Sequence, residues 1–357
     1  MCNQREIKIR IMSKNRIVYL WTWPQNFGNA FIDLGSIQSL KEAAPDYTIN
    51  QVGGLSRVLF EDRHYGQKRK IFRWIPARAI KSTPLLGERV AEINKNRFIN
   101  SMLNISEIEV NKIFKNFLDL SLHFNPDFAV LSGCILDWYL IRQFGATLLN
   151  LKNKNIKIII NGGGGSSYNE KVINKVRKFL EKIKPYGFIS RDEVAFKNYQ
   201  DLAEYSYNGI DCGFFVNDYF TPAKLEMPKY CVFTFDRQPE PEIEVKDRLI
   251  VRTHHSHYCD PPKSYFEKPN TLISNLPEDY LNLYANAEAV YSDRVHACVV
   301  ALSYGTPCKL YHKTPRALLF DRVEARGIEK ELTYPDTNRI EREKKKQIKF
   351  LSDVLEG

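Results

Sequence analysis

Two side chains that could do chemistry stand close together late in the chain, in Ser292-Asp293-Arg294-Val295-His296. This run lies between an apolar strand pattern and an apolar helix pattern, so it is predicted to begin a helix. Free backbone N–H groups and the helix dipole favour an anion there. Arg294 can bind a phosphate or carboxylate through two hydrogen bonds, and His296 could be neutral and exchange a proton. Alternatively, Arg294 pairs with a structural carboxylate and His296 is only a polar residue of the first turn.

A second arginine stands at a similar junction, in Ser190-Arg191-Asp192-Glu193. Asp192 and Glu193 complement the dipole of the helix that they are predicted to begin, whereas Arg191 does not. A cation at that place indicates that an anion lies nearby. The competing interpretation is a salt bridge from Arg191 to Asp192 or Glu193.

Two loops rich in glycine or asparagine could bring the backbone close to a ligand. In Asn26-Phe27-Gly28-Asn29, Gly28 allows a close approach and Asn26 offers both a donor and an acceptor, although the segment is also an ordinary turn. The run GGGGSS at 162–167 has neither the lysine of a P-loop nor G-x-G-x-x-G spacing. We interpret it as a turn that lets a helix and a strand pack closely.

Further polar groups follow two later strand patterns. They are His254, His255, His257 and Cys259 after one strand, and His312, Lys313 and Arg316 after another. The spacing of the first group matches no common zinc pattern, so we expect no metal, although a substrate contact is conceivable. One member of the second group could reach an anionic ligand, or all three could lie in a solvated loop.

Strand and helix patterns alternate along the chain, which favours an α/β fold with parallel sheets. The expected strands are 16–23, 128–132, 156–160, 186–190, 230–235, 248–253, 289–292 and 309–312. The expected helices are 30–44, 106–120, 137–148, 169–183, 191–199, 277–287 and 295–304, and 60–105 is read as loops and short elements. The strand pattern lapses between 217 and 228, so we expect two α/β domains, 1–217 and 218–357, the second ending in a C-terminal helix. A functional cleft would lie between them.

Composition narrows the class of protein. The 357 residues, 43% hydrophobic and 26% charged, are enough for two cores. A net charge of +10 fits anionic partners, but charges of both signs are mixed, no nucleic-acid motif is recognised, and the basic run 342–346 is read as a solvated helix face. Seven cysteines without C-x-x-C spacing favour a reducing compartment. With no signal-peptide pattern and no apolar run of about 18 residues, we expect a cytoplasmic protein.

The order and spacing of these segments together resemble the polysaccharide pyruvyl transferase family. The segments that look like family motifs are the loop Asn26-Phe27-Gly28-Asn29, the junction Ser190-Arg191-Asp192, Asp211 before Cys212-Gly213-Phe214-Phe215, the R-x-H motif Arg294-Val295-His296 with the apolar run 297–304, the turn Gly305-Thr306-Pro307, and Lys313. The resemblance covers roughly residues 16–330.

The resemblance implies a fold like that of the GT-B glycosyltransferases, with two Rossmann-like domains. It also implies transfer of the enolpyruvyl unit of phosphoenolpyruvate to a glycan or a lipid-linked sugar, where it forms a ketal with two hydroxyls. The residues that this similarity assigns are Arg191 and Arg294 to the donor, His296 to protonation of the methylene carbon, and Asn26, Gly28, Asp211 and Lys313 to the substrate site. No cofactor besides the donor is implied, and a lipid-linked acceptor would bring the protein to the inner face of the membrane.

The chain departs from the family pattern at three places. Ala195 stands where serine is frequent, Asn29 stands where aspartate is commoner, and the second glycine-rich loop appears as Ser132-Gly133-Cys134. Two other functions are therefore kept as alternatives. One is a glycosyltransferase of the same architecture that uses a sugar nucleotide, and the other is a non-catalytic relative that binds glycans.

Overall fold

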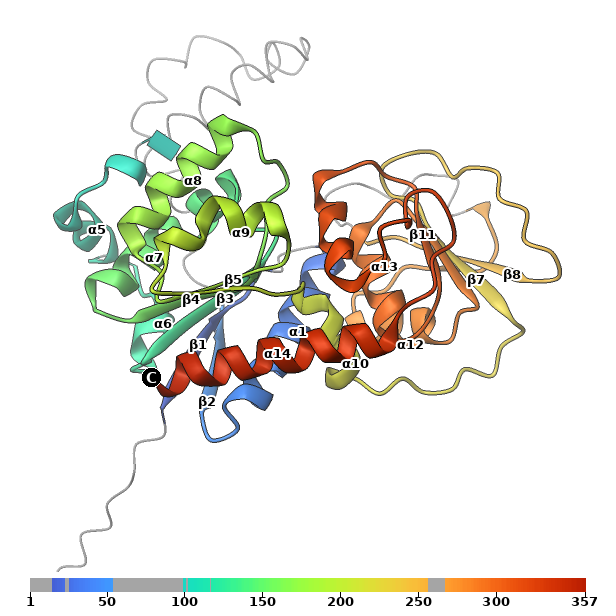
Figure 1. Ribbon diagram of the computed structural model, residues 1–357, viewed down its shortest axis with the longest axis horizontal. Helices are drawn as coiled ribbons and strands as arrows, with labels where there is room; N and C mark the ends of the chain where they lie inside the picture. Colours follow the sequence, from blue (N-terminus) through green and yellow to red (C-terminus); the bar gives the residue numbers. More distant parts are fainter. Residues whose placement is uncertain (1–14, 23–25, 54–98, 101, 116, 256–266) are drawn as a thin grey trace, which may run out of the picture.

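The computed structural model describes residues 15–22, 26–53, 99–100, 102–115, 117–255 and 267–357. Its strands form two parallel sheets, one in each lobe, with helices packed on them (Figure 1). The long helix α14 (Thr337–Glu356) runs along both lobes. The α/β fold with two parallel sheets that the sequence predicts is thus confirmed.

The first sheet has six parallel strands in the order β2-β1-β3-β4-β5-β6. Its strands are β1 (Arg16–Leu20), β2 (Thr48–Val52), β3 (Phe128–Gly133), β4 (Lys157–Gly163), β5 (Gly187–Ser190) and β6 (Tyr205–Asn208). The helical segments of this half are α1 (Phe27–Ala43), α5 (Glu107–Phe114), α6 (Leu120–His123), the π-helical turn η2 (Leu140–Phe144), α7 (Gly145–Asn153), α8 (Glu170–Ile183), α9 (Glu193–Tyr199) and the short η3 (Gln200–Leu202). The central strands are buried apolar runs because helices cover both faces of the sheet.

The second sheet has five parallel strands in the order β11-β10-β7-β8-β9. Its strands are β7 (Tyr230–Thr234), β8 (Leu249–Thr253), β9 (Thr271–Leu272), β10 (Ala289–Ser292) and β11 (Cys308–Leu310). Its helical segments are α12 (Pro277–Ala285), α13 (Val295–Ser303) and η5 (Pro315–Val323), and η4 (Cys212–Phe215) and α10 (Val216–Tyr219) connect the two sheets. Because β11, β10 and β7 are parallel neighbours, the loops that follow them begin at the same edge of the sheet, at the carboxyl ends of the strands.

Local sequence explains where several helices begin and end. Ser106 and Glu109 form a capping box at α5: the Ser106 hydroxyl accepts from the Glu109 N–H at 3.3 Å, and the Glu109 carboxylate accepts from the Ser106 N–H at 2.9 Å. Asp192 caps α9 by accepting from the Ala195 N–H at 2.8 Å. Gly305, with φ of 86°, follows the end of α13, as its type predicts.

Each sheet is completed by a helix from the other end of the chain. Phe27 and Phe31 of α1 pack in the core of the second sheet, where the Phe27 and Tyr280 rings lie 4.4 Å apart. Conversely, Leu351 and Val354 of α14 belong to a core cluster of the first sheet. Residues 209–229 join the two sheets, and the domain boundary at 217 stays a prediction.

Some predicted elements differ from the structure. The helix expected at 106–120 ends at Phe114, and α6 is separate. The helix expected at 137–148 is instead the π-helical turn followed by α7, which continues to Asn153. Within the basic run 342–346, Lys344 is not solvated: its amine lies 2.5 Å from the Asp218 carboxylate and is buried. It ties α14 to α10.

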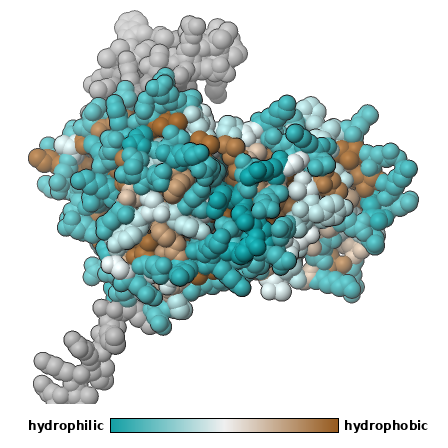
Figure 2. All heavy atoms as spheres, viewed as in Figure 1, coloured by the Kyte–Doolittle hydropathy of each residue, from teal (hydrophilic) through white to brown (hydrophobic). Residues whose placement is uncertain are grey.

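Hydrophilic side chains cover most of α14 on the face seen in Figure 2. Of the helices that the structure describes, none is long and apolar enough to cross a membrane. The cysteines that the structure places are all free thiols: Cys134, Cys212, Cys231, Cys298 and Cys308.

Candidate functional site

Predicted residues from both halves of the chain meet at the junction of the two sheets. Arg191 follows β5, and Arg294 follows β10, so both lie at carboxyl ends of strands. Asp211 lies between the halves: its Oδ2 accepts from Arg191 Nη1 at 2.8 Å and is 3.4 Å from His296 Nε2. A guanidinium, a carboxylate and an imidazole are thus connected at one place.

The Arg191 side chain has no exposed surface. Its ion-pair partner is Asp211, 20 residues away, and not Asp192 or Glu193. Asp192 instead caps α9 and accepts from the Tyr168 hydroxyl at 2.6 Å. Among the described residues, Arg191 Nε and Nη2 have no hydrogen-bond partner. Buried N–H groups are rarely left unpaired, so this guanidinium has capacity for a further anion.

Asp211 is fully buried, and its Oδ1 accepts from the Gly213 N–H at 2.8 Å. Burial alone would raise the pKa of this carboxyl, but His296, Arg191 and the Gly213 N–H together hold the pKa well below its ordinary value. Asp211 is therefore ionised, and it orients the imidazole of His296.

His296 lies in the first turn of α13 and is 6% exposed. Burial lowers its pKa, against the attraction of Asp211, and Arg191 and Arg316 lower it further by repulsion. Its other ring nitrogen faces Gly28, where an added Cβ would lie 3.2 Å from Nδ1. If Nε2 donates its proton to Asp211, Nδ1 is the atom left for a substrate.

Arg294 occupies the N-cap position of α13, where its side chain makes no capping hydrogen bond, and it is 7% exposed. Its Nη2 donates to the Asn26 side-chain oxygen at 2.9 Å, and its Nε lies 3.6 Å from an Asp236 oxygen. Asn26 uses the same oxygen to accept from the Gly28 N–H at 3.1 Å, which caps α1. The arginine therefore has a structural carboxylate, as the alternative interpretation supposed, and is also held by the predicted asparagine loop.

Asp236 follows β7 and connects Arg294 to the histidine pair. Its carboxylate oxygens lie 2.7 Å from His254 Nδ1 and accept from the His255 N–H at 2.9 Å. The His255 ring contacts the Tyr284 hydroxyl, and burial lowers the pKa of His255 to about 3. No group of three metal-binding side chains occurs in the part of the chain that the structure describes, and His257 and Cys259 lie outside that part.

The glycine run allows close packing at the end of β4. A Cβ on Gly164 would lie 2.3 Å from Arg191 Nε, and one on Gly162 would lie 2.7 Å from the Cys212 sulfur. The neighbours are therefore the buried arginine and the thiol of Cys212 rather than the helix that the sequence suggested. The run leaves room for Arg191.

Three more residues belong to this region. Arg237, Arg191 and Arg294 repel the Arg316 guanidinium, and Cys134 attracts it. Arg237 is likewise repelled by Arg294 and attracted by Cys134. Sequence reasoning named Arg316 only as one of three choices, and it did not single out Arg237 or assign a role to Cys134. By contrast, the predicted Lys313 is exposed and lines a pocket of about 550 Å³ at the same edge of the second sheet.

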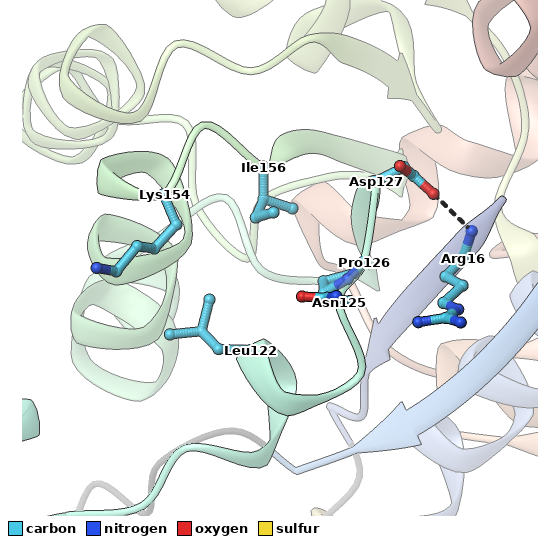
Figure 3. A pocket seen from close by; sticks show the side chains of 7 residues that line it. All are labelled: Arg16, Leu122, Asn125, Pro126, Asp127, Lys154 and Ile156. Carbon is cyan, nitrogen blue, oxygen red and sulfur yellow. Dashed lines mark hydrogen bonds between the residues drawn. The ribbon is translucent and has the colours of Figure 1, made fainter. Parts of the chain in front are cut away.

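Another pocket, of about 640 Å³, lies at the opposite edge of the first sheet (Figure 3). Its lining residues are Arg16, Leu122, Asn125, Pro126, Asp127, Lys154 and Ile156. They stand at or before the amino ends of β1, β3 and β4, whereas ligands of open parallel sheets bind at the carboxyl ends. We therefore assign the chemistry to the sheet junction.

The chain matches a known protein family over most of its length. A family model for polysaccharide pyruvyl transferase matches residues 26–308, which include all the junction residues except Arg316. No curated protein sequence matches the chain.

Solved structures share the fold. The S. aureus MnaA–UDP structure superposes with a TM-score of 0.50 at 12% identity, covering 96% of this chain and 91% of that one. A UDP-N-acetylglucosamine 2-epimerase structure superposes with a TM-score of 0.50 at 15% identity, covering 95% and 90%. These similarities show a GT-B-like fold and, at such identities, nothing about the substrate.

Proposed function

Because the chain belongs to the polysaccharide pyruvyl transferase family, we propose that it transfers the enolpyruvyl unit of phosphoenolpyruvate to a sugar of a glycan or lipid-linked precursor and forms a ketal. The observation that carries this proposal is the contact between His296 and the Asp211–Arg191 ion pair, with Arg294 held by Asn26. It supplies a proton carrier between two guanidinium groups that come from different sheets.

The two arginines match the two anionic groups of the donor. Guanidinium groups bind phosphate and carboxylate through paired hydrogen bonds. Arg294 would bind one of these groups. Arg191, whose Nε and Nη2 have no hydrogen-bond partner among the described residues, would bind the other. Since Arg191 has no exposed surface, the two lobes must separate slightly for the donor to enter.

In the proposed reaction His296 donates a proton to the methylene carbon of phosphoenolpyruvate. The negative donor raises the pKa of His296 when it binds, so the proton becomes available in the complex. C2 is then an oxocarbenium-like centre, to which one acceptor hydroxyl adds. A second hydroxyl replaces the phosphate, which leaves with its bridging oxygen, and the hydroxyl protons return to His296 and to solvent.

The acceptor is a sugar with two hydroxyls that one carbon can bridge. If that sugar is carried by a lipid, the protein would act at the inner face of the membrane. This location is part of the proposal, and it would be tested by activity on a lipid-linked acceptor in vesicles.

The first test is ligand-dependent thermal stability, because a ligand that binds only the folded protein raises the melting temperature. Phosphoenolpyruvate should stabilise the wild type but not Arg294→Ala, while the exposed control Arg326→Ala should behave as the wild type. Stabilisation by UDP- or GDP-sugars alone would contradict the proposal and indicate a glycosyltransferase.

The second test separates binding from chemistry. His296→Ala should lower turnover by about 10²–10⁴-fold, the usual contribution of a general acid, with a nearly unchanged donor dissociation constant. His123→Ala on α6 is an exposed control. Unchanged turnover in His296→Ala would remove this residue from the mechanism. Arg191→Lys should weaken donor binding, because an ammonium cannot reproduce the guanidinium fork.

A further inference from the structure

Two arginines beside the site remain after the donor has been accounted for. Arg237 follows β7 and Arg316 follows β11, the two strands that flank β10 and its Arg294. Among the described residues, neither guanidinium has a hydrogen bond or an ion pair with a carboxylate. Asp236 and Asp293 attract the Arg237 guanidinium without forming an ion pair with it, so both arginines keep capacity for an anion at the carboxyl ends of parallel strands, where ligands bind.

Hydrogen bonds hold the loop that carries Arg237. The Asp293 carboxylate accepts from the N–H groups of Arg237 at 2.7 Å and Gln238 at 3.1 Å, so it is committed to the loop after β7. The Gln238 side chain donates to the Tyr311 carbonyl, which ties this loop to β11. The loop that carries Arg237 is therefore held in place beside the end of β11.

Electrostatics and space at this edge both suit an anion. Burial lowers the pKa of Arg316 to about 10, and repulsion from Arg237, Arg191 and Arg294 contributes despite the attraction of Cys134. Burial lowers the pKa of His312, and repulsion from Arg237 and Arg316 lowers it further. The pocket of about 550 Å³ lies beside them, lined in part by Gln238, His312, Lys313 and Glu329.

We propose that Arg237, His312 and Arg316 form a second anion subsite, which binds a diphosphate group carried by the sugar acceptor. The sugar would extend along the neighbouring pocket, where Glu329 can accept hydrogen bonds from hydroxyls. The assignment to the acceptor rests on the proposed function, because phosphoenolpyruvate already engages Arg191 and Arg294. A diphosphate, with two adjacent groups of negative oxygens, suits two guanidinium groups on neighbouring strands.

The test measures binding of inorganic pyrophosphate to the full-length protein by calorimetry, with saturating phosphoenolpyruvate present. Arg237→Gln and Arg316→Gln should each weaken pyrophosphate binding about tenfold or more, while phosphoenolpyruvate binding changes less than about threefold. Arg326→Gln, 76% exposed, is the matched control. Arg316→Lys keeps the charge and should be intermediate, which separates lost recognition from misfolding.

If Arg316→Gln weakens phosphoenolpyruvate binding as much as it weakens pyrophosphate binding, the proposal is overturned, since Arg316 would then belong to the donor site. Unchanged pyrophosphate affinity in both variants would also overturn it. If only pyrophosphate binds the wild type, the proposed function fails while the subsite stands. Binding of UDP and of farnesyl diphosphate is then compared. Tighter binding of UDP would indicate a nucleotide carrier, and tighter binding of farnesyl diphosphate would indicate a lipid carrier. If neither binds, the assignment of the subsite to the acceptor is overturned.

Discussion

Replacing Asp211 by asparagine should destabilise the protein by about 3–5 kcal/mol. Asp211 is fully buried and its Oδ2 lies 2.8 Å from Arg191 Nη1, so the change leaves a buried guanidinium without its counter-charge. Removal of one partner of a buried ion pair typically has a cost of this size. The asparagine oxygen can still accept from the Gly213 N–H, so the loss is assigned to the ion pair.

The assay is urea unfolding at pH 7 followed by far-UV circular dichroism. The matched control is Asp201→Asn, because Asp201 pairs with Arg177 at 2.6 Å but is 56% exposed. Exposed pairs contribute up to about 1 kcal/mol, so the control should lose far less stability than Asp211→Asn. Both carboxylates accept short hydrogen bonds from an arginine, and burial is the main difference between them.

A second substitution tests whether the unpaired charge is the cause. Arg191→Met in the Asp211→Asn background removes the stranded cation, so the double variant should recover part of the lost stability. If Asp211→Asn loses no more stability than Asp201→Asn, or if the two changes at the buried pair simply add, the reasoning about this ion pair is refuted.

Three further outcomes follow from the geometry. Gly164→Ala should destabilise by about 1–3 kcal/mol in urea unfolding, because its Cβ would lie 2.3 Å from Arg191 Nε. Gly53→Ala, whose Cβ would have no neighbour within 4 Å among the described residues, should change stability little, and equal effects of the two substitutions would contradict the close packing. Because the folded-state pKa of His255 is about 3, below the ordinary value of about 6.5, the unfolded state binds more protons between these values, and stability should fall as pH drops through this window. The slope per group is at most about 1.4 kcal/mol per pH unit, and His255→Gln should flatten the stability curve; an unchanged curve would show that this histidine is not the buried neutral group described. Saturating phosphoenolpyruvate should slow alkylation of the half-buried Cys134, followed by peptide mass spectrometry, and an unaltered rate would place the donor elsewhere.

The strands that sequence reasoning found are those whose side chains are buried. The apolar runs of β3 and β4 gave clear patterns, whereas β2 (TINQV) and β6 (YSYN) are edge strands with polar, partly exposed residues and were missed. Edge position, which depends on the whole sheet, is not visible in five residues. In the first sheet, local pattern therefore predicted the central strands better than the edge strands.

In the candidate site, too, the residues that depend on local features were predicted and those that depend on distant contacts were not. Arg294 and His296 could be predicted because a strand end and a helix start are local features. The partner of Arg191 could not, since β6 separates it from Asp211 and the sequence offered nearer acids. Arg237 stands in a loop with no periodic pattern, and only the pairing of β7 with β10 brings it to the site.

The exchange of helices between the sheets bears on how the protein is made. Phe31 of α1 is synthesised early but packs against residues such as Tyr280, and Leu351 of α14 covers the first sheet only after the second has been synthesised. The first half of the chain therefore leaves one face of its sheet uncovered until the last helix has been synthesised. Its lobes are for the same reason poor modules for recombination.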